Sequence, residues 1–161
     1  MGNLCTKLQL KKLPPPPQSG VSKTGIEIRD IIARNLRMNV NNIYISDGNY
    51  LAYHYQTLRE FLQHDYTNRI PYQSEKFDCD DFARVLVGRE REWFHKNKHD
   101  NKASTFGQCW GDIRNSERDK TRRPHAVNFF IDANSEFWLI EPQTDILFKP
   151  TSNSSFFFAC V

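Results

Sequence analysis

The apolar positions in the first part of the chain recur mainly every three or four residues, which is the spacing of one face of an α-helix. This pattern predicts helices that begin after Thr24, over Thr57–His64 and from Cys79 to about residue 95. Thr24 followed by Glu27 has the form of a capping box, which marks the start of the first helix. The apolar face of the third helix is formed by Phe82, Val85, Leu86 and Trp93.

The last part of the chain is rich in aromatic and β-branched residues instead. Residues 125–131 and 136–141 are predicted strands, and the four residues Asp132–Ser135 between them predict a β-hairpin. Shorter strands are expected at 43–45, 146–148 and 155–160. Helices that come first and antiparallel strands that come last are typical of an α+β fold.

Residues 96–123 are polar except for the short stretch Gly107–Gly111. We interpret them as a mobile connection or a lid rather than as part of the sheet. The second cysteine nucleophile to consider, Cys109, lies in this stretch, but it has no predicted helix start beside it. Cys109 therefore ranks below Cys79 as a reactive thiol.

Residues 1–20 differ in composition from the rest and are predicted to be a flexible N-terminal segment, whereas residues 21–161 are predicted to be a single domain. Pro14–Pro17 should form a stiff polyproline spacer at the end of this segment.

The first residues of the chain, Met1–Thr6, fit the pattern for N-myristoylation at Gly2. Cys5 is a neighbouring candidate for palmitoylation, and two lipid signals together would allow peripheral membrane association. The alternative is an unmodified N-terminus that matches a short pattern by chance.

Composition narrows the class of protein. Hydrophobic residues make up 39% and charged residues 25% of the 161 residues, as in ordinary globular proteins. A net charge of +3 gives no argument for nucleic-acid binding. The four cysteines lack zinc spacing, and no secretory apolar segment or run of 18 apolar residues exists, so we expect free thiols and an intracellular, cytoplasmic location.

A thiol, an imidazole and a carboxylate occur at the edges of three predicted elements. Cys79 begins the third helix, where the helix dipole lowers a thiol pKa. His125 begins one strand of the hairpin, and Glu141 ends the other, so strand pairing can bring the carboxylate to the imidazole. This set can form a nucleophile with its general base and an orienting acid. Gln73, six positions before Cys79, is a candidate oxyanion donor.

Acidic residues surround the thiol and complicate this interpretation. Asp78, Asp80 and Asp81 would raise the pKa of Cys79, because nearby negative charge opposes thiolate formation. The same residues can cap the helix, bind a cation or repel anionic substrates. The sequence alone leaves these roles open.

The stretches Asp78–Ala83, His125–Asn128 and Glu141–Gln143 together resemble the papain-like protease domain of Marasmius oreades agglutinin, over roughly residues 40–150. The start of the helix is also similar to that of transglutaminase-like cysteine proteinases. The resemblance implies a papain-like fold with catalytic Cys79, His125 and Glu141.

The resemblance also implies calcium dependence, with Asp80 and Gln143 as the matching ligand candidates. Oxygen ligands suit calcium, but two side chains need further ligands to complete a site. The sugar-binding domain that precedes the protease part of the agglutinin lies outside the resemblance.

Three functions are consistent with these patterns. The first is a cysteine hydrolase that cleaves peptide or amide bonds of a peptide or protein substrate through an acyl-thioester on Cys79. The second is a catalytically inactive module of the same fold that acts as a binding or membrane-associated interaction protein. The third is an α+β domain in which the motifs are coincidental. The intact Cys79, His125 and Glu141 set favours the hydrolase.

Overall fold

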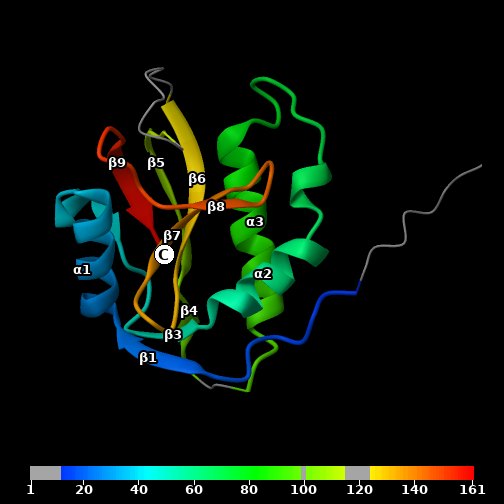
Figure 1. Cartoon of the computed structure of the whole chain (residues 1–161), viewed down its shortest axis with the longest axis vertical. Helices are drawn as coiled ribbons and strands as arrows, with labels where there is room; N and C mark the ends of the chain where they lie inside the picture. Colours follow the sequence, from blue (N-terminus) through cyan, green and yellow to red (C-terminus); the bar gives the residue numbers. More distant parts are fainter. Residues whose placement is uncertain (1–11, 99–100, 115–123) are drawn as a thin grey trace, which may run out of the picture.

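Figure 1 shows the fold in a computed structural model, which describes residues 12–98, 101–114 and 124–161. Three α-helices are present in these ranges: α1 (Gly25–Leu36), α2 (Tyr55–His64) and α3 (Cys79–Phe94). Two 3₁₀ turns, η1 (Val40–Asn42) and η2 (Thr67–Arg69), accompany them. The strands are β1 (Gly20–Thr24), β2 (Ile43–Tyr44), β3 (Asn49–Tyr53), β4 (Ala103–Ser104), β5 (Phe106–Asp112), β6 (Pro124–Ile131), β7 (Phe137–Glu141), β8 (Ile146–Phe148) and β9 (Ser155–Cys160).

A mixed six-stranded sheet forms the centre, with the strand order β2-β9-β5-β6-β7-β8. Its strand pairs are antiparallel except for β2 and β9, which run parallel. A smaller sheet with the order β1-β3-β4 lies at one end and contains one parallel pair, β3 with β4. The α+β class is confirmed, and the strands from β5 to β9 pair antiparallel as expected. The sheets are nevertheless mixed, because the short strands β2 and β4 add parallel pairs.

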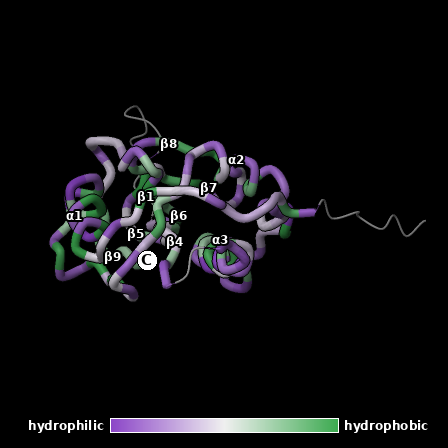
Figure 2. Tube along the Cα trace, turned by 90° about the horizontal axis from the view of Figure 1, so that it is seen from below, coloured by the Kyte–Doolittle hydropathy of each residue, from purple (hydrophilic) through white to green (hydrophobic). Residues whose placement is uncertain are grey.

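The helices cover both faces of the central sheet (Figure 1). Apolar residues of α1 pack with Val127, Phe129 and Ile131 of β6 in one core cluster. Residues of α2 and α3 pack with Phe130 and Ile140 in the other. The view from below again places α1 and α3 on opposite sides of the strands (Figure 2). A sheet covered on both faces explains why β6 is apolar along most of its length.

Asn128 is a polar residue within the apolar part of β6, and it is fully buried. Its side-chain Nδ2 donates to the carbonyl of Ala83 in α3 at 2.9 Å and to the carbonyl of Gly107 in β5 at 3.2 Å. Buried amides need such partners, because an unpaired one costs free energy. Asn128 thereby fixes the first turns of α3 against the middle of the sheet.

Local signals in the sequence explain where the helices begin. The Thr24 hydroxyl accepts from the amide of Glu27, and the Glu27 carboxylate accepts from the amide of Thr24, which confirms the predicted capping box. The start of α3 at Cys79 is also confirmed. Helix α2 begins at Tyr55, two residues before the predicted start.

The prediction that residues 96–123 form a connection or lid is wrong for the described part of that range. Residues Phe106–Asp112 are β5, a central strand between β6 and β9. Gly107 and Gly111 hid this strand, because glycine has low β-propensity. Both lie where another backbone approaches closely: a Cβ on Gly107 would be 2.4 Å from the carbonyl oxygen of Cys160.

The end of the N-terminal segment contacts the domain. The indole Nε1 of Trp93 donates to the carbonyl of Pro14 at 2.8 Å, and Leu13 packs on the core cluster of α2 and α3. The division at residue 20 stays a prediction, and the lipidation candidates Gly2 and Cys5 lie outside the described residues. Among the helices that are described, none is both long and apolar enough to cross a membrane.

Candidate functional site

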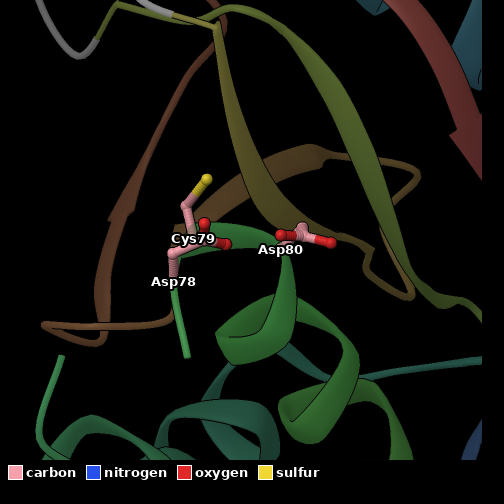
Figure 3. Close-up of side chains that lie close together, drawn as sticks. All are labelled: Asp78, Cys79 and Asp80. Atoms are coloured by element: carbon pink, nitrogen blue, oxygen red, sulfur yellow. The ribbon is translucent and has the colours of Figure 1, made fainter. Parts of the chain in front are cut away.

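The first turn of α3 presents a thiol between two carboxylates. Figure 3 shows Cys79 with Asp78 and Asp80 beside it, and the sulfur points away from the helix. Asp78 is the residue that caps α3, and its backbone amide donates to Oδ2 of Asp81 at 3.2 Å. Capping is therefore one role of the acids. It anchors the turn that carries Cys79.

The predicted pairing of His125 with Glu141 is present. His125 is the second residue of β6, and Glu141 is the last residue of β7. Nε2 of His125 lies 2.6 Å from Oε2 of Glu141, and the backbone amide of Gln143 donates to Oε1 at 3.3 Å. The side chains of both members of the pair remain about one quarter exposed, at 26% and 23%. The pair can therefore contact a ligand.

The backbone of Ala126 connects the thiol to this pair. Its amide hydrogen-bonds the sulfur of Cys79 and favours the thiolate, and Ala126 follows His125 directly in β6. Cys79, His125 and Glu141 thus gather where the start of α3 meets the ends of β6 and β7. Within the described residues, however, no hydrogen bond joins the Cys79 sulfur to the His125 ring.

The electrostatics oppose a thiolate at Cys79. Partial burial and the negative charges of Asp78 and Asp80 raise the pKa of the thiol above its usual value, and the Ala126 amide only partly offsets them. The predicted lowering by the helix start is therefore outweighed. A hydrogen bond that protonated Asp80 donates to Asp78, together with desolvation, raises the pKa of Asp80, while the charge of Arg84 lowers it.

A cation could relieve this crowding of carboxylates. One ligand atom each from Asp78, Cys79 and Asp80 lies within 4.8 Å of the others. Asp80 also forms an ion pair with the half-exposed Arg84, which a bound cation would have to displace. The side chain of Gln143, the second predicted ligand, is partly buried in the turn after β7. The donors fit the oxygen preference of calcium, except that a thiol is a poor calcium ligand.

Two other candidates do not join the cluster. Gln73 is exposed, and its backbone amide donates to the carbonyl of Phe77 at 3.0 Å, whereas its side chain makes no hydrogen bond to the described residues. Cys109 is fully buried in β5, and burial raises its pKa well above the usual value. Cys109 is therefore an inert core thiol, as its lower rank predicted.

An aromatic pair beside the cluster was missed from the sequence. Trp110 of β5 lies directly opposite Ala126 of β6, and its ring centroid is 5.5 Å from that of Phe158 in β9. Phe158 is 40% exposed. The sequence did predict a strand over Phe158 and showed the apolar stretch around Trp110, but the lid interpretation placed Trp110 outside the sheet. Trp110 thus lies on the strand next to β6, opposite the residue whose amide bonds the Cys79 sulfur.

Comparison with known proteins gives a family and a set of similar structures. The family model described as "Agglutinin C-terminal" matches residues 50–146, which is more than half of the chain and includes Cys79, His125 and Glu141. A search of curated proteins found no match.

Two solved structures share the fold. One is described as "PSL1a-E64 complex", with a TM-score of 0.73, 26% identity, and coverage of 87% of this chain and 51% of that one. The other is Polyporus squamosus lectin bound to the human-type influenza-binding epitope Neu5Aca2-6Galb1-4GlcNAc, with a TM-score of 0.70, 28% identity, and coverage of 87% and 49%. The chain thus spans about half the length of the structures that it matches.

These matches contradict the predicted cysteine hydrolase. The family is described as an agglutinin, and one similar structure is a lectin bound to a glycan, so both indicate binding rather than cleavage of peptide bonds. The raised pKa of Cys79 agrees with this correction. The prediction failed because it gave the intact Cys, His and Glu set more weight than the acidic residues beside the thiol, which were visible in the sequence.

Proposed function

Because the chain belongs to the agglutinin C-terminal family, we propose that it is a binding domain that recognises a glycan at the polar cluster around Cys79, His125 and Glu141. The agreement between this family and the glycan-bound lectin of similar fold carries the proposal. The ligand class replaces the peptide or protein substrate expected from the sequence. A papain-like arrangement of the α+β fold and the intracellular location remain predictions.

The exposed polar atoms of the cluster support a ligand rich in hydroxyl groups. Side chains of Asp80, His125 and Glu141 are 31%, 26% and 23% exposed, so each can reach a ligand while its position is fixed by protein contacts. Carboxylates accept hydrogen bonds from hydroxyls, and an imidazole can donate or accept. Because the groups come from α3, β6 and β7, they can contact several hydroxyls of one sugar.

The neighbouring aromatic pair supports the same ligand class. The C–H groups on one face of a pyranose ring pack on aromatic rings, whose faces carry negative charge density. Trp110 and Phe158 offer such a surface beside Ala126. A site that combines a few polar groups with an aromatic surface fixes both the orientation and the identity of a small ligand.

A calcium ion can be part of this site, and the ligand class would still be a glycan. We propose that Asp78 and Asp80 hold the ion, with Gln143 as a further candidate ligand and with oxygens of the glycan or water completing the shell. An ion there would neutralise the crowded carboxylates. Thermal unfolding with calcium and with magnesium, for the wild type and Asp80→Asn, tests this part alone: a calcium-specific stabilisation lost in the variant is expected.

Calorimetric titration with the Neu5Acα2-6Galβ1-4GlcNAc trisaccharide and with neutral Galβ1-4GlcNAc tests the binding function. We expect the wild type to bind at least one of the two and His125→Ala to weaken that binding by about tenfold to a hundredfold, since a lost hydrogen bond to a charged group costs roughly 1.5–3 kcal/mol. Asp30→Asn, at an exposed position of α1, is the matched control and should bind as the wild type does.

Two results would overturn the proposal. One is the absence of binding to a broad glycan panel by a correctly folded chain. The other is activity that depends on Cys79: cleavage of a peptide library, or a covalent adduct with E64 detected by intact-mass spectrometry. Either of these must disappear in Cys79→Ala. E64 is included because it is the compound in the complex with PSL1a.

A further inference from the structure

A cavity lies at the C-terminal end of α3, whereas the polar cluster lies at its N-terminal end. Its walls are the segment Lys12–Pro16 on one side and Trp93 and Lys96 of the α3 end on the other, and its volume is about 590 Å³. Cavities of about 300–1,000 Å³ are the usual size of small-molecule sites. Figure 1 shows the blue N-terminal segment passing the lower end of α3, which is the place of this groove.

One wall of the groove is formed by stiff, apolar residues. Pro14, Pro15 and Pro16 fix the backbone of one wall, because the proline ring locks φ. The hydrogen bond from Trp93 Nε1 to the Pro14 carbonyl holds this wall against the helix. Preorganised walls lower the entropic cost of taking up a ligand.

The charges at the groove have one sign. Among the described residues that line it, Lys12 and Lys96 are the ionisable ones, and both are exposed. The ammonium of Lys96 lies 3.9 Å from the carboxylate of Glu92, but these side chains are 54% and 74% exposed, and such a contact contributes little. The indole N–H of Trp93 is already used by Pro14, so the side chains offer cations and apolar surface, and no acceptor.

We infer that this groove binds a single-chain fatty acid, with its acyl chain along the prolines and Trp93 and its carboxylate between Lys12 and Lys96. An anionic headgroup on an apolar chain complements two cations at the edge of an apolar channel. A cavity of about 590 Å³ suits one chain rather than the paired chains of a bilayer lipid. This site is separate from the glycan site, so either can fail without the other.

Titration of the full chain with octanoate, decanoate and dodecanoate, all kept monomeric, tests the inference through tryptophan fluorescence and calorimetry. Each added methylene should tighten binding about fourfold until the groove is filled, which follows from the transfer free energy of a methylene group. Decanol, which lacks the charge, should bind at least tenfold more weakly than decanoate.

Charge variants locate the site. Lys12→Glu and Lys96→Glu should each weaken decanoate binding about tenfold. Lys98→Glu is the control: it makes the same change of charge at a residue near the groove that does not line it, and binding should stay within twofold of the wild type. Equal affinity for decanol, an equal effect of Lys98→Glu, or binding only to phosphatidylserine vesicles would each overturn the inference. Glycan binding by the same variants should be unchanged.

Discussion

His125 and Glu141 hold each other at the ends of two neighbouring strands, with Nε2 and Oε2 2.6 Å apart. The second carboxylate oxygen of Glu141 accepts from the Gln143 amide, so the turn after β7 also fixes its position. The pair is half-buried, which reduces screening by water and salt compared with a fully exposed pair. A preorganised polar pair of this kind is what a binding site requires.

The first prediction concerns this pair. Glu141→Ala should lower the free energy of unfolding by about 1–2 kcal/mol, because it removes two hydrogen bonds to a charged group. Glu136→Ala is the control: it breaks an exposed ion pair with Lys149 and should cost less than about 0.5–1 kcal/mol. Urea unfolding measures both. Equal losses would show that the His125 contact contributes nothing beyond a surface ion pair.

The second prediction concerns thiol reactivity. Because burial and acidic neighbours raise the pKa of Cys79, iodoacetamide should modify it slowly at pH 7 and faster as the pH rises toward 9 and above. Cys109 is fully buried and should react only after unfolding. Peptide mapping by mass spectrometry at pH 6, 7, 8 and 9 gives both rates. A fast reaction of Cys79 at pH 6 that depends on His125 would contradict the charge balance described above.

The sequence predicted the elements whose signal is local. The Thr24 capping box, the start of α3 at Cys79 and the hairpin of β6 and β7 depend on neighbouring residues, and the structure confirms them. The contact of His125 with Glu141 followed from strand pairing alone. These features need no knowledge of distant packing.

The parts that failed depend on long-range contacts. Nothing near Gly107 in the sequence shows that the backbone of Cys160 passes beside it, so β5 was taken for a lid. The parallel pairing of β2 with β9 joins residues more than 100 positions apart. Burial is the largest cause of the raised pKa of Cys79, and it depends on packing that the sequence around the thiol does not show.

The third prediction tests the close approach at β5. Gly107→Ala should destabilise the protein by about 2–3 kcal/mol, since its methyl group would meet the Cys160 carbonyl and the Phe129 ring, both at 2.4 Å. Gly88→Ala is the control, because open space surrounds this helical glycine and alanine favours helix by about 1 kcal/mol. In both thermal and urea unfolding, Gly107→Ala should therefore be less stable than the wild type and Gly88→Ala more stable. Destabilisation by both variants would contradict the packing of β5.

The fourth prediction uses a buried acid that belongs to neither site. Glu90 of α3 is fully buried and accepts hydrogen bonds from the hydroxyls of Tyr53, at 2.9 Å, and Ser104, at 2.7 Å, both to Oε1. Its Oε2 has no hydrogen-bond partner among the described residues. Burial raises the pKa of Glu90 to about 7, although Arg91 and the two hydroxyls oppose the change. The folded protein therefore keeps a proton that the unfolded chain releases near pH 4.5.

Stability should consequently fall as the pH rises from 4.5 to 7 and level off above, by about 3 kcal/mol for this group. Glu90→Gln cannot ionise, so it should not lose this stability. The difference in the free energy of unfolding, variant minus wild type, should therefore be about 2–3 kcal/mol larger at pH 8 than at pH 5. Asp145, whose pKa is also raised to about 7, is present in both proteins and cancels in the comparison. Glu92→Gln, at the exposed position two residues further along α3, should follow the wild-type curve. Urea unfolding at pH 5, 6, 7 and 8 gives the three curves, and parallel curves for the wild type and Glu90→Gln would show that Glu90 stays ionised throughout.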